Sequence, residues 1–165
     1  MSPTQALDTR VADEVYLATA LLHREQPERE DFTVSEIVNR AAKENIAGEL
    51  RPGVRVHATL HCVANRAPNP GRYRMLYATG PSTRRLLLAG DDIHPGRTGK
   101  MWPDPEAVPP AYRELIGWGK QHYTKGNPRA SRWLGGVLEL FGTGKEMYRD
   151  EDPDEYVRKL REGWD

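Results

Sequence analysis

Apolar residues recur at helical spacing near the start of the chain. Val11, Val15, Ala18 and Leu22 follow one another at intervals of four, three and four residues, which places them on one face of a helix. Pro27 comes shortly afterwards and cannot continue a helix. The pattern predicts an amphipathic first helix that ends before this proline.

A capping box marks the start of a second helix. Thr33 is followed three residues later by Glu36, so each side chain can bond the backbone N–H group of the other residue. Phe32 precedes the cap and can pack on Ile37 in the first turns. A second helix is therefore expected to run from this box towards Gly48.

A third helix is predicted over residues 53–65. Pro52 stands at a position that suits the start of a helix. Val56, Leu60 and Val63 are the apolar positions of this segment and are expected to face the core. The polar residues between them are left for another face.

Two strand-like runs follow, at residues 73–78 and 84–89. The sequence Thr-Gly-Pro-Ser between them is typical of a turn. Three helices followed by a hairpin are the element order of a winged helix-turn-helix. The predicted fold class is therefore mainly α with a small β-hairpin, a winged-helix-like body that carries an extended helical C-terminal arm.

The rest of the chain suggests where body and arm divide. Residues 90–110 are rich in glycine and proline and are expected to form an irregular connector on the surface. A packing helix is predicted over 111–123, and a Gly-Asn-Pro sequence then interrupts the chain. We therefore assign residues 1–127 to the body and 128–165 to the arm.

Composition limits the class of protein. The chain has 165 residues, 38% of them hydrophobic and 29% charged, which is enough for a folded core. We find no apolar run of about 18 residues and no signal-peptide pattern, so no membrane association is expected. The single cysteine, Cys62, excludes an internal disulfide and fits a reducing compartment, so a cytoplasmic protein is expected.

The net charge is zero, but the charge is unevenly distributed. Residues 51–100 carry nine basic and two acidic side chains, whereas both flanking parts are net acidic. Such an excess of arginine favours a polyanion such as DNA, although an ordinary solvated face is the alternative. The third helix would read bases, and the hairpin and the loop after it would hold phosphate. The residues expected to contact DNA are Arg55, His57, Thr59, Arg66, Arg72, Arg74, Arg84, Arg85, Arg97 and Lys100.

Catalytic and metal chemistry is not predicted. His57 and His61 are four residues apart and share a helix face, as two zinc ligands can, but no third ligand is evident. A buried, hydrogen-bonded His61 is the alternative. The Gly-Thr-Gly-Lys sequence at 142–145 lacks the spacing and the preceding strand of a phosphate-binding loop. We find no Ser-His-Asp or paired-carboxylate set, so we expect no enzyme, no cofactor and no metal.

The arm is too small to bury its own apolar side chains. Tyr156, Leu160 and Trp164 recur every four residues on the predicted last helix. An exposed stripe with aromatic anchors indicates a groove on another chain. The alternative is that this helix folds back onto the body.

The sequences LELFGTGKEMY, at 138–148, and DPDEYVRKLREGWD, at 152–165, resemble the toxin-binding tail of VapB-type antitoxins. Members of this family neutralise PIN-domain ribonuclease toxins. Their N-terminal domain is usually smaller, so their mode of DNA binding is not carried over to this body, which resembles winged-helix domains found beside prokaryotic toxin and restriction genes. The resemblance implies toxin contacts from Leu138, Phe141, Tyr148, Tyr156, Val157, Arg158, Leu160, Arg161 and Trp164.

A PIN ribonuclease gathers carboxylates around Mg²⁺ or Mn²⁺, and an arginine can satisfy those carboxylates bidentately. Arg158 and Arg161 both remain candidates for this role. Two functions stay open. The chain is either an antitoxin that binds a PIN-domain toxin and its own operator DNA, or a free-standing winged-helix regulator whose arm mediates dimerisation. A homo-oligomer or a heterocomplex is expected accordingly.

Overall fold

The computed structural model describes residues 9–68 and 70–127. The chain divides into two units between Asn127 and Pro128, and the described residues belong to the first unit. The predicted arm over 128–165, with all of its proposed toxin contacts, lies outside the described residues.

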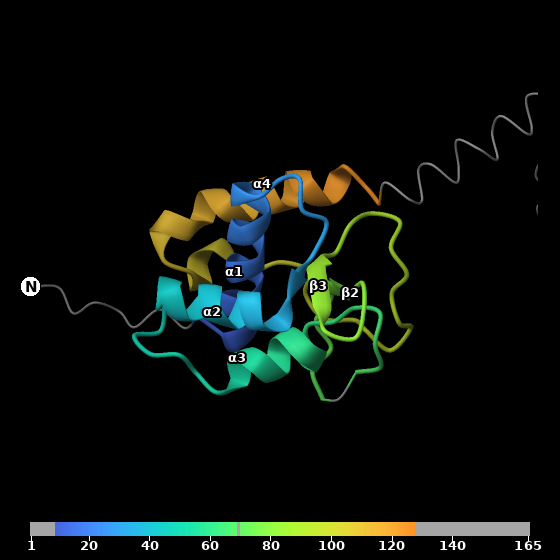
Figure 1. The fold of residues 1–165 in the computed structure, drawn as a ribbon, viewed down its shortest axis with the longest axis horizontal. Coiled ribbons are helices and arrows are strands. Elements are labelled where there is room, and N and C mark those ends of the chain that lie inside the picture. The colour runs from blue at the N-terminus through green and yellow to red at the C-terminus, as the bar shows by residue number, and fades with distance from the viewer. Residues whose placement is uncertain (1–8, 69, 128–165) are drawn as a thin grey trace, which may run out of the picture. The chain divides into compact units, whose positions relative to one another are not determined.

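The described residues form four α-helices and a small three-stranded antiparallel sheet (Figure 1). In the sheet, β3 (Thr83–Leu86) lies between β1 (Phe32–Thr33) and β2 (Leu76–Ala78). A mainly α fold with a small hairpin is thus confirmed. No helix within the described ranges has the length and apolar character needed to cross a membrane. The elements are α1 (Val11–Glu25), β1 (Phe32–Thr33), α2 (Val34–Glu44), α3 (Gly53–Val56), the π-helical η1 (His57–His61), β2 (Leu76–Ala78), β3 (Thr83–Leu86), the 3₁₀ turns η2 (Pro105–Ala107) and η3 (Pro110–Tyr112), and α4 (Arg113–Thr124).

α1 is the central helix of this unit, and α2, α3, α4 and β3 all contact it (Figure 1). Val15, Ala18 and Leu22 of the predicted apolar stripe are buried and Val11 is partly buried, but the polar side chains of Asp13, Glu14, Thr19 and His23 are buried too. The amphipathic helix expected from the stripe is therefore buried on nearly every side. Each of these polar groups requires a partner from another element or from the helix backbone.

α2 begins at the predicted capping box. The Thr33 hydroxyl accepts a hydrogen bond from the Glu36 N–H group at 3.1 Å, and the Glu36 carboxylate accepts one from the Thr33 N–H group at 2.8 Å. The helix ends at Glu44, before the predicted Gly48, because Asn45 adopts the left-handed conformation with φ 52°.

The third helix is shorter than predicted. The Cys62 N–H group bonds to the His57 carbonyl at 2.9 Å, five residues back, which is the pattern of a π-turn. Val63 then forms a bridge with Leu76, and the Ala64 N–H group donates to the Leu76 carbonyl at 2.8 Å. The chain leaves the helix after His61 because its backbone pairs with the start of the hairpin.

The sheet has one strand more than the sequence predicted. β1 consists of only Phe32 and Thr33, too short to show a strand pattern, and it pairs with the middle strand β3. The connector at 90–110 also differs from expectation, because Arg97 and Val108 within it are buried. A helix is found where the packing helix was predicted: α4 contacts α1, and its Leu115 and Ile116 are buried.

Candidate nucleic-acid interface

The continuous helical segment α3–η1 (residues 53–61) has one buried face and one exposed face. Val54 and Ala58 are buried, whereas Arg55, Val56 and Thr59 are exposed. The expectation that Val56 faces the core is wrong. The buried face is instead defined by Val54 and Ala58, four residues apart, and Ala58 is too small to mark this face in the sequence pattern. The exposed face thus combines a cation, a hydroxyl-bearing residue and an apolar side chain.

Two further arginines lie beside this segment without an ion-pair partner. Among the described residues, neither Arg66 nor Arg72 has an acidic group within 4.0 Å, and the same is true of Arg55. Gly71, which precedes Arg72, lies so close to His61 that an added Cβ would come within 3.0 Å of its Cα atom. The loop therefore brings Arg72 next to the end of η1.

Three arginines predicted to hold phosphate are instead buried in the domain. The first is Arg84, whose side chain is fully buried. All five of its N–H donors are directed at backbone carbonyl oxygens, so it has no donor left for DNA. Burial lowers the pKa of Arg84 to about 10, and the neighbouring Arg66 acts in the same direction. The acceptors belong to Ala58, Thr59, Gly80, Pro81 and Thr83.

Arg97 repeats this arrangement from the connector. It is 3% exposed, and its five N–H donors are also directed at five backbone carbonyl oxygens. Burial lowers the pKa of the Arg97 guanidinium. The sequence suggested a phosphate-clamping loop here, but the side chain points into the domain. The acceptors belong to Leu60, His61, Arg66, Ala67 and Tyr73.

Arg85 is the third buried arginine, and it has an acidic partner. Its guanidinium makes two hydrogen bonds to the Asp91 carboxylate, at 2.6 and 2.8 Å, and lies 4.4 Å from the centre of the Tyr77 ring. This bidentate ion pair joins β3 to the segment that follows it. Asp91 follows Arg85 by only six residues, so the nearby acidic residue was a sign in the sequence that Arg85 could be paired within the domain. No such sign indicated the burial of Arg84 and Arg97.

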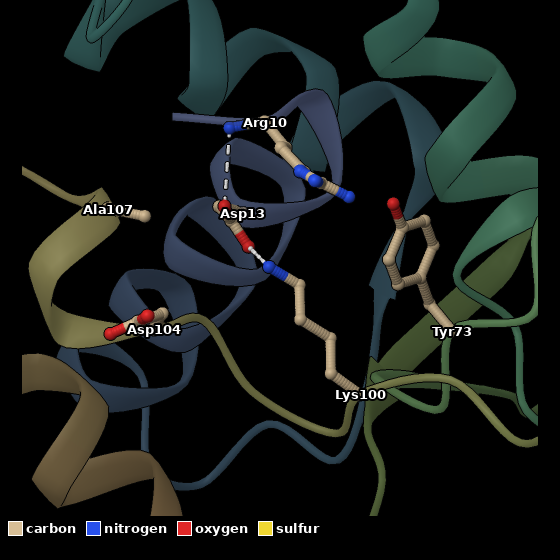
Figure 2. A pocket seen from close by; sticks show the side chains of 6 residues that line it. All are labelled: Arg10, Asp13, Tyr73, Lys100, Asp104 and Ala107. Atoms are coloured by element: carbon tan, nitrogen blue, oxygen red, sulfur yellow. Dashed lines mark hydrogen bonds and ion pairs between the residues drawn. The ribbon is translucent and has the colours of Figure 1, made fainter. Parts of the chain in front are cut away.

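The other predicted contacts are partly engaged. Arg74 Nε donates to the Gly99 carbonyl at 2.8 Å. The Lys100 ammonium lies 2.7 Å from the buried Asp13 carboxylate, in a cleft of about 520 Å³ (Figure 2). Arg10, Tyr73, Asp104 and Ala107 complete the lining of this cleft. Lys100 is therefore neutralised within the domain.

The two histidines of η1 lie against each other. The rings of His57 and His61 are 4.8 Å apart in an edge-to-face arrangement, and His57 Nδ1 is 2.8 Å from the Gly53 carbonyl oxygen. Burial is the main cause that lowers the pKa of His57. His61 Nδ1 is buried and has no hydrogen-bond partner among the described residues. In the same ranges, no group of three or more His, Cys, Asp or Glu side chains is arranged to hold a metal ion.

Comparison of the chain with models of protein families, with curated proteins and with solved structures gave no match.

Proposed function

We propose that the body of this chain is a winged-helix DNA-binding domain and that the chain is an antitoxin. The element order α1–β1–α2–α3–β2–β3 supports the first part, as does a sheet in which the last strand lies in the middle. In a winged helix this arrangement places the third helix and the hairpin turn on one side of the domain. The helix reads the major groove of DNA and the hairpin lies beside it.

The observation that carries the DNA-binding proposal is the exposed face of α3–η1 with its unpaired cations. Arg55 can donate two hydrogen bonds to guanine, and Val56 and Thr59 can contact thymine methyl groups. Arg66 and Arg72, which lack acidic partners among the described residues, would contact phosphates beside the helix.

The hairpin turn makes a different contribution from the one expected. Residues 79–82 contain no cation, and Pro81 and Ser82 are exposed. The turn would therefore meet DNA through neutral groups. Phosphate affinity would come from the loop at 66–72 rather than from the arginines of the hairpin.

The antitoxin half of the proposal rests on the resemblance of residues 138–165 to VapB-type tails. The arm would bind a PIN-domain ribonuclease, and the body would bind the operator of the same operon. The alternative, a free-standing regulator that dimerises through its arm, shares the DNA-binding body and differs only in the partner of the arm.

DNA binding is tested by selecting duplexes from a random pool with the full-length protein. We expect the Kd of the selected duplex to rise steeply with salt, because phosphate contacts release counterions. Arg55→Ala should weaken the selected duplex by about 1–3 kcal/mol and relax the preference at one base pair. Arg72→Ala should weaken all duplexes alike and lower the salt slope by about one.

Arg24→Ala is the matched control, since Arg24 is exposed, lies in the last turn of α1 and has no ion pair among the described residues. It should leave both the affinity and the salt slope unchanged. If the wild-type protein binds no duplex even at about 50 mM salt, the DNA-binding proposal is wrong.

A further inference from the structure

The end of α3–η1 is held by two arginine side chains that come from later parts of the chain. The carbonyl groups of residues 58–61 lie at a helix C-terminus, where the backbone supplies few N–H donors; among these four, the Leu60 carbonyl also accepts the Val63 N–H group at 3.2 Å. Arg84 donates to the first two of these carbonyl groups, at 3.2 Å each. Arg97 donates to the last two, at 2.8 and 2.6 Å. The two guanidinium groups therefore cap the helix jointly.

Each arginine also joins the helix to a second segment. The remaining donors of Arg84 bind the carbonyl groups of Gly80, Pro81 and Thr83, so this side chain connects the helix to the turn of the hairpin. The remaining donors of Arg97 bind the carbonyl groups of residues 66, 67 and 73. This side chain connects the helix to both ends of the loop that carries Arg66 and Arg72.

The chemistry of the two sites requires a guanidinium. Its five N–H donors form a rigid planar fork, whereas a lysine ammonium has three donors on a flexible stem. Neither Arg84 nor Arg97 has an acidic group within 4.0 Å among the described residues. Their charge is stabilised by carbonyl dipoles, at the end of the helix that carries partial negative charge.

We propose that Arg84 and Arg97 are positioning residues for DNA recognition: they fix the reading helix relative to the hairpin turn and the phosphate-binding loop. This inference rests on the proposed function and assigns both residues a role without contact to DNA. With all five donors engaged, each arginine acts on DNA only through the segments that it joins.

The experiment compares Arg84→Lys and Arg97→Lys in the full-length protein with Arg85→Lys as matched control. Arg85 is also buried and follows Arg84 in sequence, but it binds Asp91 and makes no hydrogen bond to α3–η1 among the described residues. Two quantities are measured: the ratio of the Kd values for a scrambled and the selected duplex, and the salt slope of the selected duplex. Measurements are made well below the unfolding midpoint of each variant.

Arg84→Lys and Arg97→Lys should each reduce the Kd ratio at least about tenfold. The salt slope should stay within about 0.5 of wild type, because no phosphate contact is lost. Arg85→Lys should keep both quantities. A fall in slope of about one in either variant would mean that the arginine itself contacts phosphate, and an unchanged ratio would mean that positioning is not needed; both overturn the inference.

A second measurement uses only the wild-type protein, and it tests the inference even if the substitutions unfold the domain. In the wild-type protein, the selected duplex should slow hydrogen exchange at the Cys62 and Ala64 amides and at the Thr79 amide of the hairpin turn together, each by at least about fivefold. Slowing confined to one of these segments would show that they do not bind as one unit. Wild-type protein that selects no duplex at all contradicts the proposed function itself, which separates that failure from failure of the inference.

Discussion

His23 is buried within the domain as a neutral hydrogen-bond acceptor. Its Nε2 atom accepts the Leu86 N–H group at 3.2 Å, which attaches α1 to β3. Burial is the main cause that lowers the pKa of His23 to about 3, and the nearby His122 and Arg85 lower it further. Protonation would remove the acceptor and place a charge in the core.

The stability of the domain should therefore fall between pH 7 and pH 5. The pKa of His23 is lower in the folded state than the ordinary value of about 6.5, so the unfolded chain takes up the proton first. The contribution of the neutral ring is complete above pH 6.5 and decreases as the pH falls towards 3. At pH 5 the loss is about 2 kcal/mol. Urea unfolding at pH 7, 6 and 5 measures it.

His23→Gln tests the assignment, since the glutamine oxygen can accept the same N–H group without titrating in this range. The variant should lose less stability between pH 7 and pH 5 than wild type. His122→Gln serves as the comparison, because burial also lowers the pKa of His122 but its ring makes no hydrogen bond to the backbone among the contacts described. An equal pH dependence of wild type and His23→Gln would exclude His23 as the cause.

The burial of three polar residues on α1 could not be predicted from the sequence. Asp13, Glu14 and His23 are polar and lie on a helix for which the apolar stripe predicted one buried face. Their partners, Lys100, Arg51 and the Leu86 N–H group, come from positions 87, 37 and 63 residues away in the chain. Nothing in a local pattern specifies such distant pairs, so the burial of these residues could not be predicted.

At the scale of elements, α1 and α4 are in close contact where Tyr16 of α1 lies against Gly119 of α4. A Cβ atom added at Gly119 would overlap the hydroxyl of the buried Tyr16, whereas one added at Gly117, two residues earlier in α4, would meet nothing within 4 Å. The absence of a side chain at 119 thus lets the two helices approach each other.

Gly119→Ala and Gly117→Ala should therefore change stability in opposite directions. Gly119→Ala forces Tyr16 or α4 to shift and should cost about 1–3 kcal/mol of unfolding free energy. Gly117→Ala removes backbone freedom from the unfolded chain and should add about 0.4–1 kcal/mol. Denaturant unfolding of the two variants measures both values. A stabilising Gly119→Ala would show that the α1–α4 contact described is wrong.

The elements that the sequence predicted correctly are those with local signals. The capping box of α2 spans four residues, and the start of α3 after Pro52 depends on one. The elements that it missed depend on pairing across the fold. β1 exists because β3 lies beside it, and α3–η1 ends at His61 because Ala64 bonds to Leu76. Helix starts were thus predictable here, whereas the helix end and the extra strand were not.

At the scale of the whole molecule, the nine basic residues of 51–100 divide into three groups. Arg51, Arg74 and Lys100 are partly exposed, and each binds a carboxylate or a carbonyl group of another segment. Arg84, Arg85 and Arg97 are buried and hold the body together, while Arg55, Arg66 and Arg72 lack acidic partners among the described residues. Composition gives the size of the excess but not this division. The division depends on which carbonyl and carboxylate groups the fold brings close to each arginine.

The proposed toxin-binding arm gives a further prediction. Co-expression with a PIN-domain ribonuclease encoded beside its gene should give a stable heterocomplex without ribonuclease activity. Arg158→Ala or Arg161→Ala, whichever residue enters the toxin site, should cost about 2–5 kcal/mol of complex stability. Excess Mg²⁺ should compete with that arginine. Trp164→Ala should weaken the complex by about 2–4 kcal/mol without this dependence on Mg²⁺.

Lys159→Ala is the control for these changes, since it removes a cation between the two arginines in sequence. Ribonuclease activity is titrated with each variant at two Mg²⁺ concentrations. If neither arginine variant alters inhibition, occlusion of the toxin site by an arginine is wrong. If the chain purifies as a homodimer without a ribonuclease, the free-standing regulator is the better description.

The two guanidinium caps also carry an evolutionary consequence. Every amino acid supplies a backbone carbonyl, so Arg84 and Arg97 do not depend on which side chains occupy positions 58–61, 66, 67, 73, 80, 81 and 83. Among descendants of a common ancestor, the exposed side chains of α3–η1 can therefore diverge to follow new operators while both arginines stay unchanged. Such a lineage would show two invariant arginines with no covarying partner. By contrast, Arg85 and Asp91 would change together.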